Sequence, residues 1–393
     1  MLSLCLYING KPGQVFRFYQ PCTSPNVHKS CARHVFRENI MKQTMYAVLA
    51  AISMLTIGCG PQNPPEPKPN PNDTTAVNPP DTIPEKPQVP FPSEGYIPAK
   101  FQVADGKYVY FSKGNLQFNA ASGEHACADT TTQKGTWRFA ENQYDCVYPS
   151  GNSKASETYD GWIDNFAWGT SGWNSGAVCY QPWSTSGNKE DYNVGNNPNS
   201  DLTGDLAYAD WGVYNAISNG GNLPRQWRTL TKPEWQYLFR NTHWAFARII
   251  VSEELYVNGM MFIPDGFTKP ADINIVEVGT GNLEENDASD MKKALPINKY
   301  TLEQFGVLEA QGCVLLPFAD ETKDQYSKGY YWSASTDGEM RAQKWHVVFN
   351  YPYIDEDFPE FSSEGYTQVN FNDANCADRH HRLAVRLAVD ARD

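Results

Sequence analysis

A proline-rich stretch, residues 60–94, sets the strongest limit on what this chain can fold into. Thirteen of the 27 prolines lie between Pro61 and Pro98, interleaved with Asn, Asp, Thr and Lys. Such a segment cannot bury enough apolar surface to offset the entropy lost on ordering, and proline favours extended polyproline II. We therefore expect residues 60–94 to form a disordered, semi-rigid tether. The globular part is then a single domain, residues 95–393, which is long enough to bury a sizeable core.

The segment before the tether, residues 41–59, has the layout of a secretory signal peptide. Lys42 precedes an apolar run from Met45 to Ile57, and Gly58 and Cys59 follow. The run is short for a transmembrane helix, and the tether offers no core that could bury it. A small residue before a cysteine resembles the bacterial lipobox, in which the cysteine is diacylated and becomes the new N-terminus. The resemblance implies a lipid anchor at Cys59 and an outer-membrane protein displayed at the cell surface.

Residues 1–40 differ from the rest of the chain in charge. They carry +4, and because the whole chain carries −13, the remainder carries −17. Since a signal peptide starts a protein and Met41 is a ready initiator, we expect residues 1–40 to be an upstream extension from an incorrectly assigned start codon. The negative field of the remainder repels a phosphate backbone and argues against a nucleic-acid partner.

The cysteines of the globular domain are few and scattered. They show no CxxC spacing and no accompanying histidine cluster, which argues against a zinc site. Cys127 and Cys146 are the closest candidates for a disulfide. The remaining three lie at Cys179, Cys313 and Cys376.

The hydrophobic pattern of the domain changes from strand to helix and back to strand. Thr231-Lys-Pro-Glu234 and Thr301-Leu-Glu-Gln304 are capping boxes that predict two helix starts. A shorter helix is expected after Asp210. Residues 147–205 lack periodicity and predict long ordered loops held by tryptophans. Alternating segments predict strands at 107–112, 116–118, 136–139, 313–317, 330–335, 345–349 and 383–389. Together these elements predict an α+β domain.

Residues 228–237, Arg-Thr-Leu-Thr-Lys-Pro-Glu-Trp-Gln-Tyr, resemble a signature of the formylglycine-generating enzyme, or sulfatase-modifying factor, family. That signature reads Arg-Leu-Pro-Thr-Glu-Ala-Glu-Trp-Glu-Tyr. Residues 384–387 look like the closing strand of the same family, in which Arg386 would be a structural arginine paired beneath the strand. The resemblance implies a C-type-lectin-like fold. The matching positions are Arg228, Thr231, Glu234, Trp235 and Tyr237.

A closer likeness is to lipoproteins common in Bacteroidetes, which resemble the Fibrobacter succinogenes major paralogous domain and the C-terminal domain of Legionella collagen-like protein. Short sequence motifs of these lipoproteins recur here in order between residues 107 and 389. They lie at residues 109–117, 137–143, 166–172, 210–221, 227–231 and 331–335. The likeness implies a fold but no function, because one fold hosts many functions. It also implies that Trp211, Trp227, Trp235 and Trp332 belong to the core.

The formylglycine-generating family implies an enzyme with a redox cysteine pair that binds copper. The C-terminal third of this chain has only Cys313, in an apolar strand, and Cys376, in a polar loop that lacks the catalytic phrase. We therefore predict a protein that is not an enzyme and has no cofactor. The acidic stretches 284–287 and 355–357 leave calcium open as a ligand, against the alternative of solvated loops.

The segment 351–375 is the candidate ligand-binding surface. Its aromatic residues alternate with small polar ones without any period, which suits rigid contacts combined with adaptable hydrogen bonds. The alternative is a loop that buries its aromatic rings in a satellite core. The residues assigned to ligand binding are Tyr351, Tyr353, Tyr366, Asn370 and Asn372.

We therefore expect a surface lipoprotein with a lectin-like, non-catalytic domain that binds a glycan or a surface protein. A structural or adhesive component without a discrete ligand is the alternative, and an oxidase of the formylglycine-generating type is a third reading. Glycan binding would favour aromatic rings in one concave site, whereas a protein partner would favour a flat patch.

The anchor can be tested with Cys59→Ala. The acyl chains supply the affinity for the membrane, so the variant should leave the membrane fraction or remain unprocessed, as followed by fractionation and by metabolic lipid labelling. Unchanged fractionation together with unchanged labelling would show that Cys59 carries no anchor.

Overall fold

The computed structural model describes residues 89–147, 149–174, 176–196, 199–277, 297–318, 326–338, 340–350, 366–370 and 376–392. Residues 1–40, the signal segment with Cys59 and most of the expected tether lie outside this part. No helix within the described ranges has both the length and the apolar character needed to cross a membrane.

The folded domain begins earlier than the expected boundary at residue 95. The ring of Phe91 packs against Tyr96 and Tyr110, with centroid separations of 5.4 and 5.7 Å. The side-chain amide of Gln226 donates to the carbonyl oxygen of Pro90 at 2.9 Å. An aromatic ring gives this end of the proline-rich segment apolar surface to bury, and residues 89–94 therefore belong to the domain rather than to the tether.

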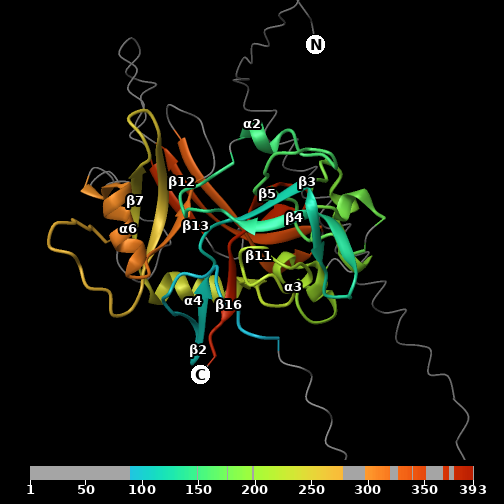
Figure 1. The fold of residues 1–393 in the computed structure, drawn as a ribbon, viewed down its shortest axis with the longest axis horizontal. Coiled ribbons are helices and arrows are strands. Elements are labelled where there is room, and N and C mark those ends of the chain that lie inside the picture. The colour runs from blue at the N-terminus through green and yellow to red at the C-terminus, as the bar shows by residue number, and fades with distance from the viewer. Residues whose placement is uncertain are drawn as a thin grey trace, which may run out of the picture. The chain divides into compact units, whose positions relative to one another are not determined.

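Within the described residues, sixteen strands form four sheets, whose arrangement is drawn in Figure 1. The first sheet has the order β1-β2-β16-β6, formed by Phe101–Ala104, Lys107–Phe111, Leu387–Asp390 and Arg228–Thr229. The second has the order β10-β8-β7-β9, formed by Val314–Pro317, Tyr256–Ile263, His243–Ile250 and Lys299–Thr301. The third is the hairpin of β3, Leu116–Ala126, and β4, Thr132–Phe139.

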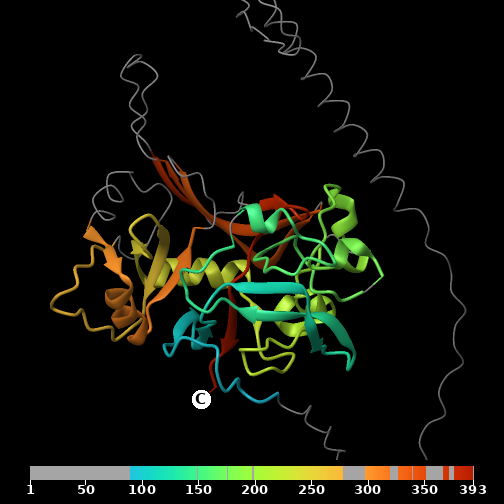
Figure 2. The same ribbon diagram turned by 45° about the horizontal axis from the view of Figure 1, so that its top comes forward.

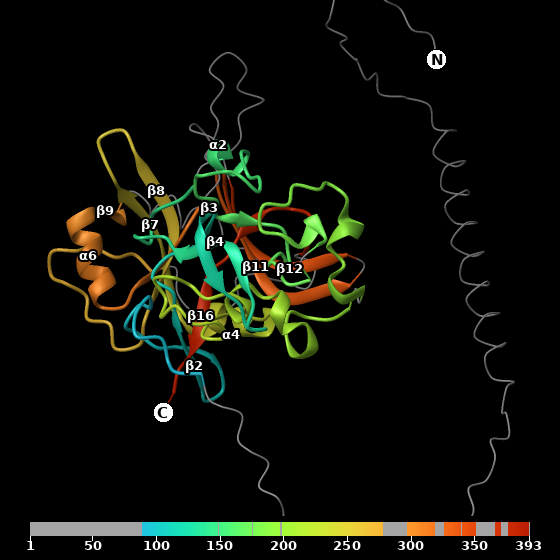
Figure 3. The ribbon, with the colours of Figure 1, turned by 45° about the vertical axis from the view of Figure 1, so that its right-hand side comes forward.

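The fourth sheet contains the candidate ligand-binding segment. Its strand order is β13-β12-β11-β15-β5, formed by Tyr366–Asn370, Arg341–Asn350, Tyr326–Gly338, Leu383–Ala384 and Asn165–Phe166. A further strand, β14, Cys376–Asp378, pairs with β12. In all three views the β7–β8 hairpin lies at one side of the domain, apart from the β3–β4 hairpin (Figures 1, 2 and 3).

Both capping boxes begin helices where the sequence predicts them. The backbone N–H of Thr231 donates to the Glu234 carboxylate at 2.8 Å, at the start of α4, Lys232–Asn241. The backbone N–H of Gln304 donates to the Thr301 hydroxyl at 3.2 Å, at the start of α6, Leu302–Ala310. Phe305 and Leu308 of α6 are buried, whereas Leu302, its first residue, is exposed.

The other helices of the described residues are short and lie within the loops. Asp210 caps α3, Trp211–Tyr214, the short helix expected after Asp210, which ends where Asn215 has extended backbone angles. The remaining turns are α2, Pro149–Asn152, and the 3-10 segments η1, Val178–Tyr180, η2, Lys189–Tyr192, η3, Val194–Asn196, and η4, Gly204–Ala209. Helices and strands together confirm the α+β class.

The loops between β4 and β6 are ordered by tryptophans, as the sequence predicts. Trp168 is fully buried and donates its indole N–H to the carbonyl oxygen of Ser333 at 2.9 Å. Trp173 and Trp183 pack against the same core. Trp162 lies under the guanidinium of Arg138, 3.7 Å from its ring centroid. Large aromatic contacts thus replace regular hydrogen-bonding in this region.

Trp235 provides a test of the packing beneath α4. Its side chain is 2% exposed, and its ring lies 5.3 Å from Trp345 and 5.8 Å from Phe111. Trp235→Ala should lower the free energy of unfolding by about 3–5 kcal/mol, because truncation removes buried area and leaves a cavity. Urea unfolding measures this loss, and an unchanged midpoint would show that the ring does not fill the core.

Candidate ligand-binding surface

Most of the residues assigned to ligand binding lie outside the described part of the chain. These are Tyr351, Tyr353 and Asn372. Tyr366 and Asn370 are the first and last residues of β13, where they pair with Asn350 and His346 of β12. Their backbones are therefore placed, whereas the role of their side chains stays a prediction.

Strand β12 holds both parts of the candidate segment. Residues 346–350 pair with residues 366–370, and residues 341–343 pair with residues 376–378. The stretches 351–365 and 371–375 consequently start and end on strands hydrogen-bonded to β12. On its other side β12 pairs with β11, so the strands that flank the candidate segment, β13 and β14, lie at the edge of the sheet next to β12.

The β11–β12 pair is fixed by buried aromatic residues. The rings of Tyr331 and Trp345 are stacked, with centroids 4.5 Å apart and planes within 3°. The Tyr331 hydroxyl accepts from the Asn115 amide at 3.1 Å and donates to the Pro317 carbonyl oxygen at 2.8 Å. Trp332 donates its indole N–H to the Phe166 carbonyl oxygen at 2.8 Å. Both faces of the pair are therefore locked by packing and hydrogen bonds.

A hollow lies between the first turns of α4 and the β11–β12 pair. It is partly open to the surface and is far smaller than the roughly 300–1,000 Å³ of a site for a drug-sized molecule. The residues that line the hollow are Lys232, Trp235, Ser333, Gln343, Lys344 and Trp345.

Three buried polar atoms in the lining residues have no hydrogen-bond partner among the described residues. They are the indole N–H groups of Trp235 and Trp345 and the side-chain carbonyl oxygen of Gln343. The amide nitrogen of Gln343, in contrast, donates to Asp337 at 2.6 Å. Buried polar groups are normally paired, so this concentration is unusual. The sequence predicts that Trp235 is a core residue, but it contains no signal for an unpaired N–H group.

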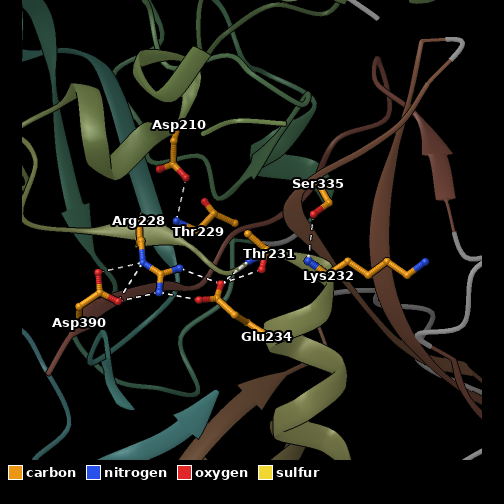
Figure 4. Close-up of polar contacts among 8 residues, drawn as sticks. All are labelled: Asp210, Arg228, Thr229, Thr231, Lys232, Glu234, Ser335 and Asp390. Atoms are coloured by element: carbon orange, nitrogen blue, oxygen red, sulfur yellow. Dashed lines mark hydrogen bonds and ion pairs between the residues drawn. The ribbon is translucent and has the colours of Figure 1, made fainter. Parts of the chain in front are cut away.

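Two lysines, Lys232 and Lys344, are among the residues that line this hollow. The ammonium of Lys344 lies 5.1 Å from the centroid of the Tyr330 ring, and burial lowers the pKa of Lys344 to about 8. The backbone N–H of Lys232 donates to the Ser335 hydroxyl at 3.1 Å, and its side chain extends away from the neighbouring ion pairs (Figure 4).

The signature residues Arg228 and Glu234 form an ion-pair cluster with Asp390 (Figure 4). Both terminal nitrogens of Arg228 donate to the Glu234 carboxylate at 2.8 Å, and one also donates to Asp390 at 2.6 Å. Burial alone would disfavour the cation, but the two carboxylates outweigh it and raise the pKa of Arg228. The cluster joins β6, the start of α4 and β16.

Asp210 connects the turn α3 to strand β6. Its carboxylate accepts from the backbone N–H of Gly212 at 2.9 Å and from the backbone N–H of Thr229 at 2.8 Å (Figure 4). The side chain is buried, and this burial raises the pKa of Asp210 to about 6. The Asp210-Trp-Gly phrase is thus explained by a helix cap that also binds a neighbouring strand.

The thiols show no activation. The five cysteines of the described part form no disulfide, and Cys127 and Cys146, the candidate pair, are therefore not bonded. Burial raises the pKa of Cys313 to about 12 and also raises that of Cys376. A reactive or copper-binding cysteine needs a thiolate. Cys313 immediately precedes β10, whereas Cys376 begins β14 of a different sheet.

Metal ligands do not gather in the described ranges, which contain no group of three or more His, Cys, Asp or Glu side chains able to hold an ion. The acidic stretches 284–287 and 355–357, on which the calcium alternative depends, lie outside those ranges.

No family model, no curated protein and no solved structure matches this chain.

The pKa of Asp210 can be tested by comparing the parent with Asp210→Asn. The folded state binds the Asp210 proton more tightly than the unfolded state, whose pKa is near 3.8. The contribution of Asp210 to the free energy of unfolding is therefore largest below pH 4 and is lost as pH rises through 6. The free energy of unfolding of the parent minus that of the variant should fall by roughly 3 kcal/mol between pH 4 and pH 7.

Urea unfolding across this pH series gives the difference directly. Asp164, whose pKa burial also raises to about 6, is present in both proteins and cancels. The variant should also lose a constant increment, because the two N–H groups bond to different carboxylate oxygens and Asn replaces one of these oxygens with an NH2 group that cannot accept. A difference that is independent of pH would show that Asp210 titrates normally in the folded state.

Proposed function

We propose that this protein is a non-catalytic ligand-binding module, anchored in the outer membrane by lipid at Cys59 and displayed at the cell surface. Its domain is a C-type-lectin-like fold of the formylglycine-generating-enzyme type, and its ligand is a glycan or a surface protein. The observation that carries the proposal is the attachment of residues 351–365 and 371–375 to the locked strand β12.

The physical argument is that β12 provides a rigid support, while the segments attached to it provide the proposed binding residues. Binding residues are commonly carried on loops that a rigid scaffold positions. The scaffold here is the stacked Tyr331–Trp345 pair and the strands hydrogen-bonded around it. The segments between the paired residues keep no hydrophobic period, which a packed element would require and a ligand-facing surface does not.

Two features support a binding protein over an enzyme. The described cysteines have raised rather than lowered pKa values where a shift is resolved, as for Cys313 and Cys376. The polar cluster around Arg228 is saturated by Glu234 and Asp390, so it serves to join strands and a helix. A binding module needs neither an activated nucleophile nor a general base.

A screen of the full chain against a glycan array and a surface-protein array tests the proposal. A reproducible ligand in either class supports a binding module and identifies the class. Failure to retain any glycan or protein would favour the structural or adhesive alternative.

The position of the binding surface is tested with Tyr351→Ala, Tyr353→Ala and Tyr366→Ala. Each should weaken binding of the array ligand by at least about tenfold while leaving the melting temperature nearly unchanged, because exposed anchors contribute to affinity and not to stability. Tyr256→Ala is the matched control, since Tyr256 is an exposed tyrosine on β8, and it should bind normally. Early melting of all three variants would identify the tyrosines as buried supports and move the surface elsewhere, to residues 160–185.

A further inference from the structure

We infer that His125 forms a proton-dependent contact between the β3–β4 hairpin and the residues that follow α3, with both ring nitrogens bonded only in the protonated ring. The inference goes beyond the proposed binding function and holds for any ligand. It is carried by two distances. Nδ1 of His125 lies 2.9 Å from the carbonyl oxygen of Gly135, and Nε2 lies 2.8 Å from the side-chain oxygen of Asn215.

The orientation of the Asn215 amide is set by its own hydrogen bonds. Its nitrogen donates to the backbone carbonyl oxygens of Ser171 at 2.9 Å and of Trp211 at 3.0 Å. Reversing the amide would place its oxygen against these two carbonyl oxygens, which can only accept. The Cys127 thiol lies 4.0 Å from the same Asn215 oxygen as a weak donor, and burial keeps it protonated by raising its pKa to about 11. The oxygen of Asn215 is therefore the end that faces His125.

Two acceptors on one imidazole ring require two N–H groups. A neutral histidine carries a proton on one ring nitrogen and a lone pair on the other, whereas the imidazolium donates from both. In either neutral tautomer of His125, a nitrogen lone pair would face an oxygen lone pair of Gly135 or of Asn215. The two short contacts are therefore those of the charged ring, and the neutral ring must open one of them.

Burial sets the pH at which His125 takes up its second proton. The side chain is buried, and the rings of Phe118 and Trp137 lie edge-on to it. Burial lowers the pKa of His125 below its ordinary value of 6.5, although the hydrogen bonds to Gly135 and Asn215 act in the opposite direction. The ring is therefore neutral at pH 7, with one contact open, and the second bond forms on mild acidification.

The second bond does not make the whole domain more stable in acid. The unfolded chain, in which His125 has its ordinary pKa, takes up the proton more readily than the folded one. The contribution of His125 to the free energy of unfolding is therefore present above pH 6.5 and is lost as pH falls through the lowered pKa. Protonation changes the local contact and not the balance in favour of the fold.

The other ionisable groups near the ring leave its titration to burial and to the two oxygens. None of them is among the causes that shift the pKa of His125 within the described residues. The stretch 171–172 contributes none. The hairpin contributes Glu124, Cys127, Asp129 and Lys134, and α3 contributes Tyr214, whose hydroxyl donates to Asp129 at 2.9 Å.

Asn215 connects the state of His125 to the tryptophan-rich loops. Its amide nitrogen donates to the carbonyl oxygen of Ser171, and the Ser171 hydroxyl accepts from the backbone N–H of Trp173 at 3.2 Å. A movement of Asn215 when His125 titrates therefore reaches Trp173, which lies within residues 160–185. Acidification should thus alter the position of these loops through a single buried ring.

The inference is tested by following the ring nitrogens of His125 in ¹⁵N spectra of the full chain from about pH 7.5 to about pH 5, the range in which histidine changes charge. The chain has seven histidines, and correlation to the backbone assigns the ring of His125 without any variant. At the upper end one ring nitrogen should carry no proton. As pH falls below 6.5, that nitrogen should gain a proton, and the side-chain amide of Asn215 and the backbone N–H of Trp173 should shift with the same midpoint.

Three variants identify the origin of the shift. His125→Gln has no ring to titrate, so the shift of Asn215 should be lost. His243→Gln is the matched control, because His243 is an exposed histidine paired with Glu277, and it should keep the shift. Asp210→Asn should also keep it, which separates His125 from the buried carboxylate that caps α3 and titrates near 6.

The parent spectra alone can overturn the inference, so it stays testable even if His125→Gln does not fold. A ring that keeps both protons throughout the series would show a permanent contact. A ring that stays neutral to the lowest pH would show that the second bond never forms. A titration of His125 that leaves the Asn215 amide in place would show that the proton does not act on this contact.

Discussion

The arrangement of this domain depends above all on the buried side chain of Gln143. Its carbonyl oxygen accepts from the backbone N–H of Leu315 at 2.7 Å and from Arg386 at 3.0 Å. Its amide nitrogen donates to the Cys313 carbonyl oxygen and to Glu309, both at 3.0 Å. The full hydrogen-bonding capacity of one amide thus joins β10 and α6 to the C-terminal chain. Each buried partner left unpaired would cost about 1–3 kcal/mol, so these bonds fix how the sheets meet.

Arg386 extends this network to the point where the chain crosses between two sheets. It lies between β15 of the sheet that holds β12 and β16 of the sheet that holds β2 and β6. No carboxylate of the described residues forms an ion pair with it. Its fully buried guanidinium is instead bonded to the amide oxygens of Gln143 and, at 3.5 Å, Asn115. Burial lowers the pKa of Arg386 to about 10, so the side chain stays charged at neutral pH.

In this fold, the residues that stabilise the core differ from the residues that are proposed to bind the ligand. Trp345 lies in the core beneath β12, while the pairing of β12 with β13 and β14 carries the ends of the candidate segment. Substitutions in that segment can change what is bound without disturbing the stacked Tyr331–Trp345 pair.

The sequence by itself determined the features that depend on neighbours in the chain. The capping boxes at Thr231 and Thr301 locate α4 and α6, an apolar run at 330–335 locates β11, and alternation at 345–349 locates β12. Only the tertiary structure decided features that depend on distant residues. The β7–β8 hairpin is buried along nearly its whole length and shows no alternation, and Leu302 is exposed because no element covers that side of α6 in the described residues. Likewise, the unpaired atoms of Trp235, Gln343 and Trp345 come from an α-helix and a strand that meet only in the fold, and no local pattern can record which partners a buried polar atom finds there.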